Sequence, residues 1–222
     1  MKRIQPAILG LVTAVVSSHA SLTYVNETGG NGEPTLNTIM TTVYGAANYT
    51  RVDDSIDKIW DLMNPTGIAS LDAIYAGNSQ ALYTTDLSGN QKAGPIISVS
   101  GGGYISPGSA TGTIAPTVNP FLFMDNSPNT STTYWYSDPA LNSDLLDHMV
   151  TFAITGGANA GDYVIAFEDL PYAQSDLDYN DLVVQVSGVA PVPEATTIIA
   201  GVLLLLPLGV STLRILRRHR LA

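Results

Sequence analysis

Short apolar runs separated by turn-forming segments recur along most of the chain. The runs are rich in β-branched and aromatic residues, a pattern typical of strands. Segments rich in Gly, Asn, Ser and Pro lie between them. Strands are expected at 21–25, 37–44, 70–76, 81–86, 95–100, 121–125, 132–137, 149–155, 163–169 and 182–187. Many short strands at this spacing predict an all-β domain, either a sandwich or a jelly-roll-like fold.

One segment departs from this pattern and predicts a helix. Across 51–65 the apolar residues recur with a helical period, and Asp53 and Asp54 stand near the start, where a helix dipole favours negative charge. Asn64 and Pro65 mark the expected end. A second short helix is expected around 139–148, with Asp138 as its N-cap. Both helices would cover an end of the β domain.

The N-terminus has the pattern of a secretory signal peptide. Lys2 and Arg3 precede an apolar stretch at 6–16, and Ser18 and Ala20 are small residues suited to cleavage after Ala20. The apolar stretch is shorter than the ~20 residues that span a bilayer. Residues 1–20 are therefore expected to be removed by signal peptidase during export.

The C-terminus has the pattern of a membrane anchor. Residues 195–213 form an uncharged run of 19 residues, within the ~17–25 that a transmembrane helix needs. A basic tail at 214–222 follows, containing Arg214, Arg217, Arg218 and Arg220. By the positive-inside rule this tail is expected in the cytoplasm, so the helix predicted at 196–213 would anchor the chain in the inner membrane.

Residues 21–190 remain as one acidic ectodomain. Residues 21–194 contain 19 acidic residues and three basic ones, giving 3 − 19 = −16. Such a surface repels nucleic acid and attracts cations. The chain has no cysteine, which excludes disulfides, cysteine nucleophiles and cysteine zinc sites. His148 is the one histidine of the ectodomain, so a histidine-rich metal site is excluded.

Carboxylates are crowded between the last two long strands, with no basic residue nearby. Packing like charges together is unfavourable unless a cation shares the site, and Ca²⁺ prefers six to eight oxygen ligands. The alternative is a solvated acidic turn that uses Asp and Asn as turn residues. The predicted Ca²⁺ ligands are Glu168, Asp169, Asp176, Asp178, Asn180 and Asp181.

The order of these ligands excludes an EF-hand loop. Asp176, Asp178 and Asn180 would fit its first three ligand positions, but Asp181 stands where glycine is needed and Ser187 where glutamate is needed. An extended backbone at 176–180 would instead point these three side chains the same way. Asp181, Glu168 and Asp169 could then complete the shell.

The segment FEDLPYAQSDLDYNDLVVQV, residues 167–186, resembles the signature of a bacterial secreted domain family of unknown function. Its members share an F-E-D sequence, a short loop, S-D-x-D-Y-N-D and an apolar strand. Residues 51–60, 73–80 and 147–152 also resemble segments of this family. The resemblance implies an all-β extracellular domain, often supposed to bind calcium, with no known enzymatic activity.

The C-terminal segment 191–222 resembles the PEP-CTERM sorting signal, which consists of a Val-Pro-Glu-Pro box, a membrane span and a basic cluster. The box here is Val192, Pro193, Glu194 and Ala195, with alanine in place of the second proline. The resemblance implies processing by an exosortase-like membrane protease of Gram-negative bacteria that make extracellular polysaccharide. The protein would then reach the cell surface or extracellular matrix, or stay membrane-anchored if the box is not cut.

Three functions follow as expectations. The first is a calcium-stabilised surface or matrix protein without catalytic activity. The second is an exopolysaccharide-binding module with Tyr134 and Tyr136 as a stacking platform, although strand alternation favours a core role for the segment, with Trp135 buried and the two tyrosines exposed. The third is a glycosidase, disfavoured because Glu168 and Asp169 would point to opposite faces of a strand.

Overall fold

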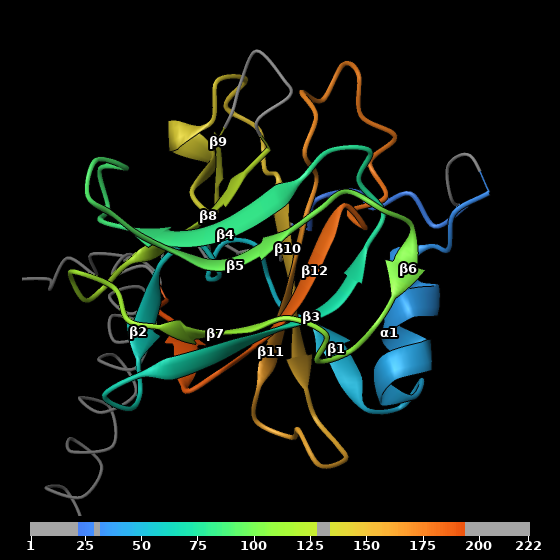
Figure 1. Ribbon diagram of the computed structural model, residues 1–222, viewed down its shortest axis with the longest axis horizontal. Helices are drawn as coiled ribbons and strands as arrows, with labels where there is room; N and C mark the ends of the chain where they lie inside the picture. Colours follow the sequence, from blue (N-terminus) through green and yellow to red (C-terminus); the bar gives the residue numbers. More distant parts are fainter. Residues whose placement is uncertain (1–21, 29–31, 128–133, 194–222) are drawn as a thin grey trace, which may run out of the picture.

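The computed structural model describes residues 22–28, 32–127 and 134–193. Within these residues the chain is mostly β-sheet with one short α-helix (Figure 1). The larger sheet runs in the order β1-β10-β11-β12-β3-β6, with β7 also paired to β3. Its strands are β1 (Tyr49–Arg51), β10 (Met149–Ile154), β11 (Tyr163–Phe167), β12 (Leu182–Ser187), β3 (Gly67–Ile74), β6 (Tyr104–Ile105) and β7 (Thr111–Ile114).

A four-stranded sheet packs over one face of the larger sheet. Its order is β5-β4-β8-β9, and a small ribbon pairs β13 with β2. All strand pairs within the described residues are antiparallel. These strands are β5 (Lys92–Val99), β4 (Gln80–Thr85), β8 (Leu122–Asn126), β9 (Tyr134–Tyr136), β13 (Val189–Pro191) and β2 (Trp60–Leu62).

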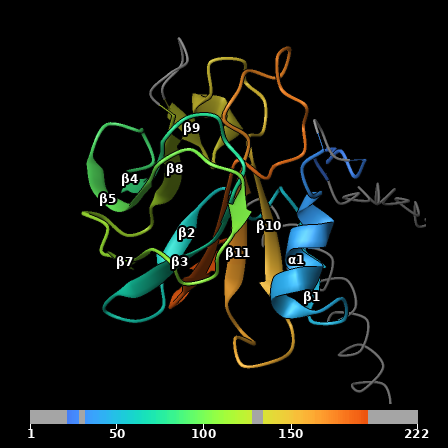
Figure 2. The same cartoon turned by 45° about the vertical axis from the view of Figure 1, so that its right-hand side comes forward.

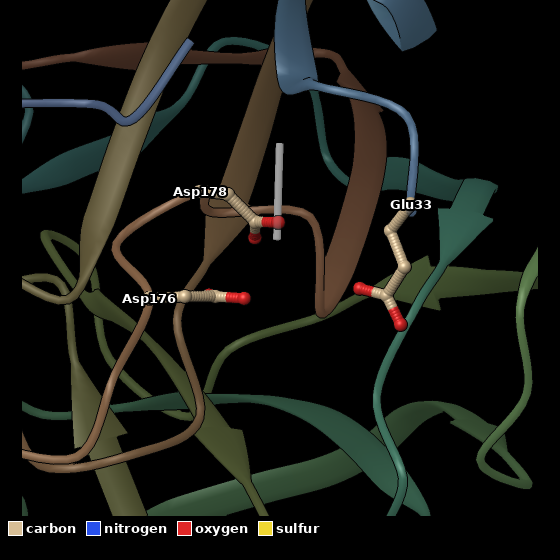
Figure 3. A group of neighbouring side chains, drawn as sticks. All are labelled: Glu33, Asp176 and Asp178. Carbon is tan, nitrogen blue, oxygen red and sulfur yellow. The ribbon is translucent and has the colours of Figure 1, made fainter. Parts of the chain in front are cut away.

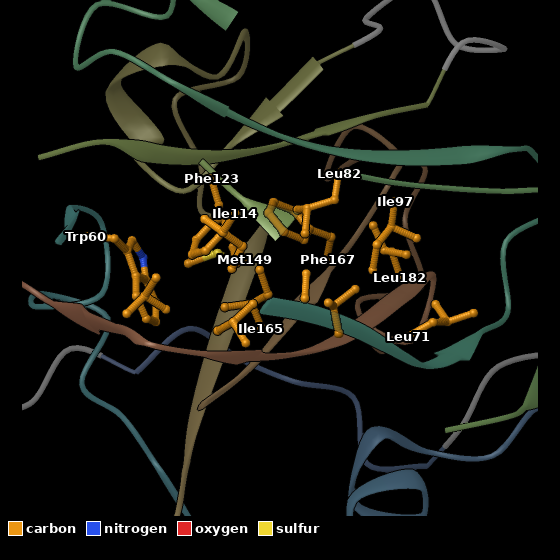
Figure 4. Close-up of a cluster of buried hydrophobic side chains, with 14 of the residues drawn as sticks. Trp60, Leu71, Leu82, Ile97, Ile114, Phe123, Met149, Ile165, Phe167 and Leu182 are labelled. Atoms are coloured by element: carbon orange, nitrogen blue, oxygen red, sulfur yellow. The ribbon is translucent and has the colours of Figure 1, made fainter. Parts of the chain in front are cut away.

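The main core lies between the two sheets (Figure 4). The larger sheet contributes Ile165 and Phe167, and the smaller one Leu82 and Phe123, all fully buried. Trp60 packs edge-on against Phe123 with ring centroids 5.2 Å apart. Apolar side chains alternate with more exposed ones along several strands, so one face of each sheet supplies the core. The domain is therefore a two-sheet sandwich, as the sequence predicts.

Helix α1 (Leu36–Tyr44) covers the opposite face of the larger sheet (Figure 2). Leu36, Ile39 and Met40 are fully buried there. The strand predicted at 37–44 was therefore wrong. Its Thr and Val residues favour strands, but a helical apolar stripe that can be buried on the sheet outweighs that weak preference. The Thr35 hydroxyl caps the helix by accepting a hydrogen bond from the Thr38 N–H, 3.1 Å away.

The helix predicted at 51–65 was also wrong. The segment instead contains the end of β1, a turn and strand β2. The Asp53 carboxylate accepts a hydrogen bond from the Ser55 N–H at 2.9 Å, a local bond that competes with helix formation. Trp60 exchanges two 2.9 Å backbone hydrogen bonds with Phe121, which places its ring in the core. Tertiary pairing thus overrides the helical spacing.

Two shorter predictions have different outcomes. Residues 22–25 of the strand predicted at 21–25 are irregular. The helix predicted at 139–148 is reduced to one 3-10 turn, η1 (Pro139–Leu141). Asp138 caps it as predicted, since its carboxylate accepts a 3.0 Å hydrogen bond from the Ala140 N–H.

The predicted signal peptide and residues 194–222 of the predicted sorting segment fall outside the described residues. These include Ala20, Glu194, Ala195, the predicted membrane span 196–213 and the basic tail with Arg214, Arg217, Arg218 and Arg220. None of the helices in the described part of the chain is long and apolar enough to cross a membrane. Val192 and Pro193 are described, and the Val192 N–H donates to the Ile59 carbonyl at 2.7 Å. The ordered fold therefore reaches the predicted sorting box.

Candidate cation-binding site

The acidic loop, residues 168–181, leaves the larger sheet at the end of β11 and returns to it at the start of β12. Phe167 and Leu182 are directly paired across the two strands. The residues that follow Phe167 and the residue that precedes Leu182 are therefore neighbours, although 12 positions separate Asp169 from Asp181. This geometry brings three carboxylates together at the mouth of the loop.

These three residues, Glu168, Asp169 and Asp181, form what we call the inner cluster. Each offers a carboxylate oxygen, and these oxygens all lie within 4.8 Å of one another. The Asp169 N–H also donates to Asp181 Oδ2 at 2.8 Å. The prediction that Glu168 and Asp169 point to opposite faces was wrong, because β11 ends at Phe167 and strand alternation does not continue beyond it.

Two neighbouring side chains from the smaller sheet hold Asp169 in place. Asp169 Oδ2 accepts hydrogen bonds from the Gln80 amide and from the Ser127 hydroxyl, the latter at 3.0 Å. The indole N–H of Trp135 donates to the Asp169 carbonyl at 2.8 Å. The inner cluster therefore joins the two sheets of the sandwich.

Two buried side-chain oxygens, one in the inner cluster and one beside it, lack a hydrogen-bond partner. Glu168 is 2% exposed, and its Oε2 atom accepts no hydrogen bond; Gln80 is 1% exposed, and its Oε1 atom likewise accepts none. Burying an acceptor without a donor is costly. A bound cation would satisfy these oxygens, because carboxylate and amide oxygens are the ligands that Ca²⁺ prefers.

Burial makes charge in the inner cluster unfavourable. The pKa of Glu168 is raised to about 7, chiefly by burial and also by the charges of Asp176 and Asp178, while hydrogen bonds with Ser175 and Asp181 oppose the rise. Burial likewise raises the pKa of Asp169, and it holds the pKa of Asp181 well above its usual range together with the charges of Glu168 and Asp169. A divalent cation would offset both the cost of burying these carboxylates and the repulsion between them.

A fully buried carboxylate that the sequence did not predict lies close by. Asp125 on β8 has no exposed surface. Burial, followed by the charge of Asp169, holds the pKa of Asp125 well above its usual range. In the sequence this residue ends the apolar run FLFMD and looks like the solvent-facing end of a strand. Its proximity to the inner cluster results from the packing of the smaller sheet over that cluster, which the sequence alone does not reveal.

Two other predicted ligands, Asp176 and Asp178, gather with Glu33, which the sequence did not predict, in a second group that we call the outer cluster (Figure 3). Their carboxylates point toward a common space, and one oxygen from each lies within 4.8 Å of the others. Asn180 belongs to the same surroundings, because its Nδ2 donates to Asp178 Oδ2 at 2.7 Å. The six predicted ligands thus separate into two groups instead of one shell.

The backbone of the loop explains this separation. Leu177 and Tyr179 have left-handed conformations, with φ of 62° and 54°. Such conformations are uncommon for residues other than glycine, and they break the extended geometry that the sequence suggested for 176–180. The Tyr179 ring is buried against the α1 side of the sheet, and its hydroxyl donates to the Asp147 carbonyl at 2.7 Å.

The tyrosines predicted as a sugar platform lie on β9, one on each side of Trp135. Trp135 is fully buried between them, as strand alternation predicts, while Tyr134 and Tyr136 are half-buried. The Lys92 ammonium lies 3.1 Å from the centre of the Tyr134 ring. A sugar stacked on that face would have to displace this cation–π contact.

His148 has a packing role. The His148 ring stacks on Trp135 with centroids 3.6 Å apart, and its Nε2 lies 3.0 Å from Asp144 Oδ2. Its Nδ1 lies 3.1 Å from the Glu168 carbonyl oxygen. The histidine therefore packs against the backbone of the inner cluster and helps to hold it in place.

Residues 114–189 match the sequence model of a domain of unknown function, DUF4114. The match covers β8 to β12 and the whole acidic loop, but less than half of the chain. It leaves out α1 and Glu33. No curated protein and no solved structure matches the chain.

Proposed function

We propose that this chain is an exported protein of the cell surface or extracellular matrix whose β-sandwich is stabilised by Ca²⁺ at the inner cluster, without catalytic activity. One observation carries the proposal: three carboxylates from Glu168, Asp169 and Asp181 meet at a sheet junction, and a buried Glu168 oxygen there has no hydrogen-bond partner. Calcium is abundant outside cells, so such a site suits an extracellular domain.

The charge distribution favours neutralisation of the inner cluster by a bound cation over neutralisation by basic side chains of the protein. The ectodomain contains only Arg51, Lys58 and Lys92 as basic residues. Arg51 pairs with Asp54 at 2.7 Å, and Lys92 lies over Tyr134. A secreted domain without disulfides gains from a metal ion that connects segments distant in sequence.

Export and sorting rest on the terminal sequences. Residues 1–20 would be removed by signal peptidase, and the segment 191–222 would direct the chain to an exosortase-like membrane protease of a Gram-negative bacterium. The first residue of the predicted box, Val192, donates its N–H to the Ile59 carbonyl at 2.7 Å, so the box would begin directly beside the sandwich. Extracellular polysaccharide remains a candidate partner for the surface-displayed domain, and nucleic acid does not.

The variant Asp181→Asn tests the inner cluster. Asparagine has nearly the shape of a protonated aspartate and can still accept the hydrogen bond from the Asp169 N–H. The metal-free variant should therefore fold, with stability equal to or above that of the wild type, while losing the stabilisation by Ca²⁺. Thermal unfolding with EDTA and with Ca²⁺ measures both quantities.

Glu27→Gln is the matched control, since it replaces an exposed carboxylate that belongs to neither carboxylate cluster. It should respond to Ca²⁺ as the wild type does. If Ca²⁺ stabilises Asp181→Asn as much as the wild type, the inner cluster is not the Ca²⁺ site.

A further inference from the structure

Asp125 on β8 is completely buried, and its carboxylate has no hydrogen-bond partner. Neither Oδ1 nor Oδ2 accepts a hydrogen bond from the described part of the chain. The N–H groups of Ala81 and Asn126 lie near enough to lower the pKa of this carboxyl, but not in hydrogen-bond geometry. Burying a carboxylate without a partner is costly, so this position suits a ligand that the carboxylate can hold.

The Asp125 side chain points from the smaller sheet toward the larger one. Asp125 lies two positions after Phe123 on the same strand, so both side chains share a face, and Phe123 is buried between the sheets (Figure 4). Leu82 is paired with Asp125 on one side and Trp135 on the other, and both belong to the same core. The carboxylate therefore lies inside the sandwich.

The neighbours of Asp125 on this face bind Asp169 of the inner cluster. The Trp135 indole N–H donates to the Asp169 carbonyl at 2.8 Å, and the Ser127 hydroxyl donates to Asp169 Oδ2 at 3.0 Å. Trp135 is paired with Asp125, and Ser127 lies two positions after it. After burial, the charge of Asp169 is the next cause of the raised pKa of Asp125, so the two carboxylates are close. Asp125 thus faces the inner cluster from the opposite sheet.

The distances favour a bridge between Asp125 and a cation over direct contact. The carboxylate oxygens that lie within 4.8 Å of one another come from Glu168, Asp169 and Asp181, without Asp125. Ca²⁺ takes roughly six to eight oxygens, so these three residues leave room for water in its shell. A water molecule bound to the ion is a strong hydrogen-bond donor, which suits a carboxylate that has no partner.

We propose that Asp125 is a positioning residue of the inner cation site: it accepts a hydrogen bond from a water molecule bound to the ion, so that both sheets hold the cation. Glu168, Asp169 and Asp181 bind the ion from the larger sheet, and Asp125 orients its water from the smaller one. This inference rests on the proposed function, because it assigns a further residue to the same site.

The arrangement makes calcium a connection between the two sheets. Without the cation, negative charge on Asp125 and Asp169 is repulsive across the core. With the cation, both carboxylates are attracted to one centre. Ca²⁺ should therefore slow hydrogen exchange of the β8 amides, and this protection should be lost without the Asp125 carboxylate.

Calcium titration of the full chain tests this role with Asp125→Leu and Asp125→Asn. Both variants should bind Ca²⁺ about 10–100-fold more weakly than the wild type, the range typical for loss of a partner outside the metal ligands. The metal-free variants should be at least as stable as the metal-free wild type, because each removes a buried carboxylate without a partner. A residue that only supports the fold would give lower metal-free stability and unchanged affinity.

Asp57→Asn is the matched control for these variants. Asp57 is 1% exposed, its Oδ2 atom also lacks a hydrogen-bond partner, and it belongs to neither carboxylate cluster. This variant should bind Ca²⁺ with the affinity of the wild type, and its β8 amides should keep their protection by Ca²⁺. An equal loss of affinity in Asp57→Asn would attribute the effect to net charge and overturn the role of Asp125.

Asp181→Asn separates this inference from the proposed function. If Asp181→Asn loses Ca²⁺ binding while both Asp125 variants keep the wild-type affinity, the role of Asp125 is overturned and the proposed function stands. Failure of the wild type to bind Ca²⁺ would overturn both. Unfolding of both Asp125 variants without metal would assign Asp125 a structural role and also overturn the inference.

Discussion

Ca²⁺ at 100 times its dissociation constant should stabilise the metal-free protein at pH 7.5 by ~2.7 kcal/mol, since a ligand that binds only the folded state stabilises it by mass action. For a domain of this size that corresponds to an increase of about 5–10 °C in melting temperature. The physical reason lies in the inner cluster, where the cation offsets the repulsion among Glu168, Asp169 and Asp181 and satisfies a buried Glu168 oxygen. Thermal unfolding with EDTA and with millimolar Ca²⁺ measures the difference.

Ionic strength must be matched in this comparison. Residues 21–194 carry 3 − 19 = −16 formal charges, so any salt reduces the self-repulsion of this part of the chain. NaCl at the ionic strength of the Ca²⁺ sample should reproduce little of the increase. An equal increase with NaCl would attribute the effect to screening and contradict a specific site.

The stabilisation by Ca²⁺ should grow as the pH rises from about 5 to 8. Burial raises the pKa of Glu168 from 4.5 to about 7, so the folded metal-free protein holds a proton that the unfolded chain has released in this window. The unfolded state then binds fewer protons than the folded state, and metal-free stability falls with rising pH. Since each unit of pKa difference between the folded and unfolded states changes stability by about 1.36 kcal/mol, the raised pKa of Glu168 makes the metal-free protein measurably less stable at pH 8 than at pH 5.

Calcium opposes this loss of stability at higher pH, because it binds the deprotonated carboxylates and competes with their protons.

Buried carboxylates outside the inner cluster provide an internal comparison. The pKa of Asp72 is raised to about 7, and that of Asp147 to about 6, in both cases chiefly by burial. Both should lower stability as the pH rises, with or without Ca²⁺. Unfolding free energies measured from pH 5 to 8 in both conditions should therefore diverge; parallel curves would contradict the role of Glu168.

The sandwich could be predicted from sequence where strands are long and alternate. Strands β8 to β12 and the central strands β3 and β4 have apolar runs bounded by turn residues, and both sheets are built from them. The errors arose where local preference and tertiary packing disagree. Helix α1 is rich in β-branched residues, and the segment 51–65 has helical spacing but pairs through Trp60 with Phe121.

The candidate site likewise contains some residues whose proximity follows from the predicted strands and others whose proximity does not. The carboxylates of the inner cluster flank two strands that form a hairpin, so their proximity follows from pairing that the sequence reveals. Glu33 lies in a turn-rich segment more than 140 positions before Asp176, and no local pattern connects the two. Asp125 similarly reaches the inner cluster only through the packing of one sheet on the other. Long-range placement of this kind depends on the whole fold.

Calorimetric titration of Ca²⁺ into the metal-free full chain at pH 7.5 tests the central claim most directly. Saturable binding is predicted, and binding at the inner cluster should be lost in Asp181→Asn and retained in Glu27→Gln. The absence of saturable Ca²⁺ binding to the wild-type chain would contradict a calcium-stabilised domain.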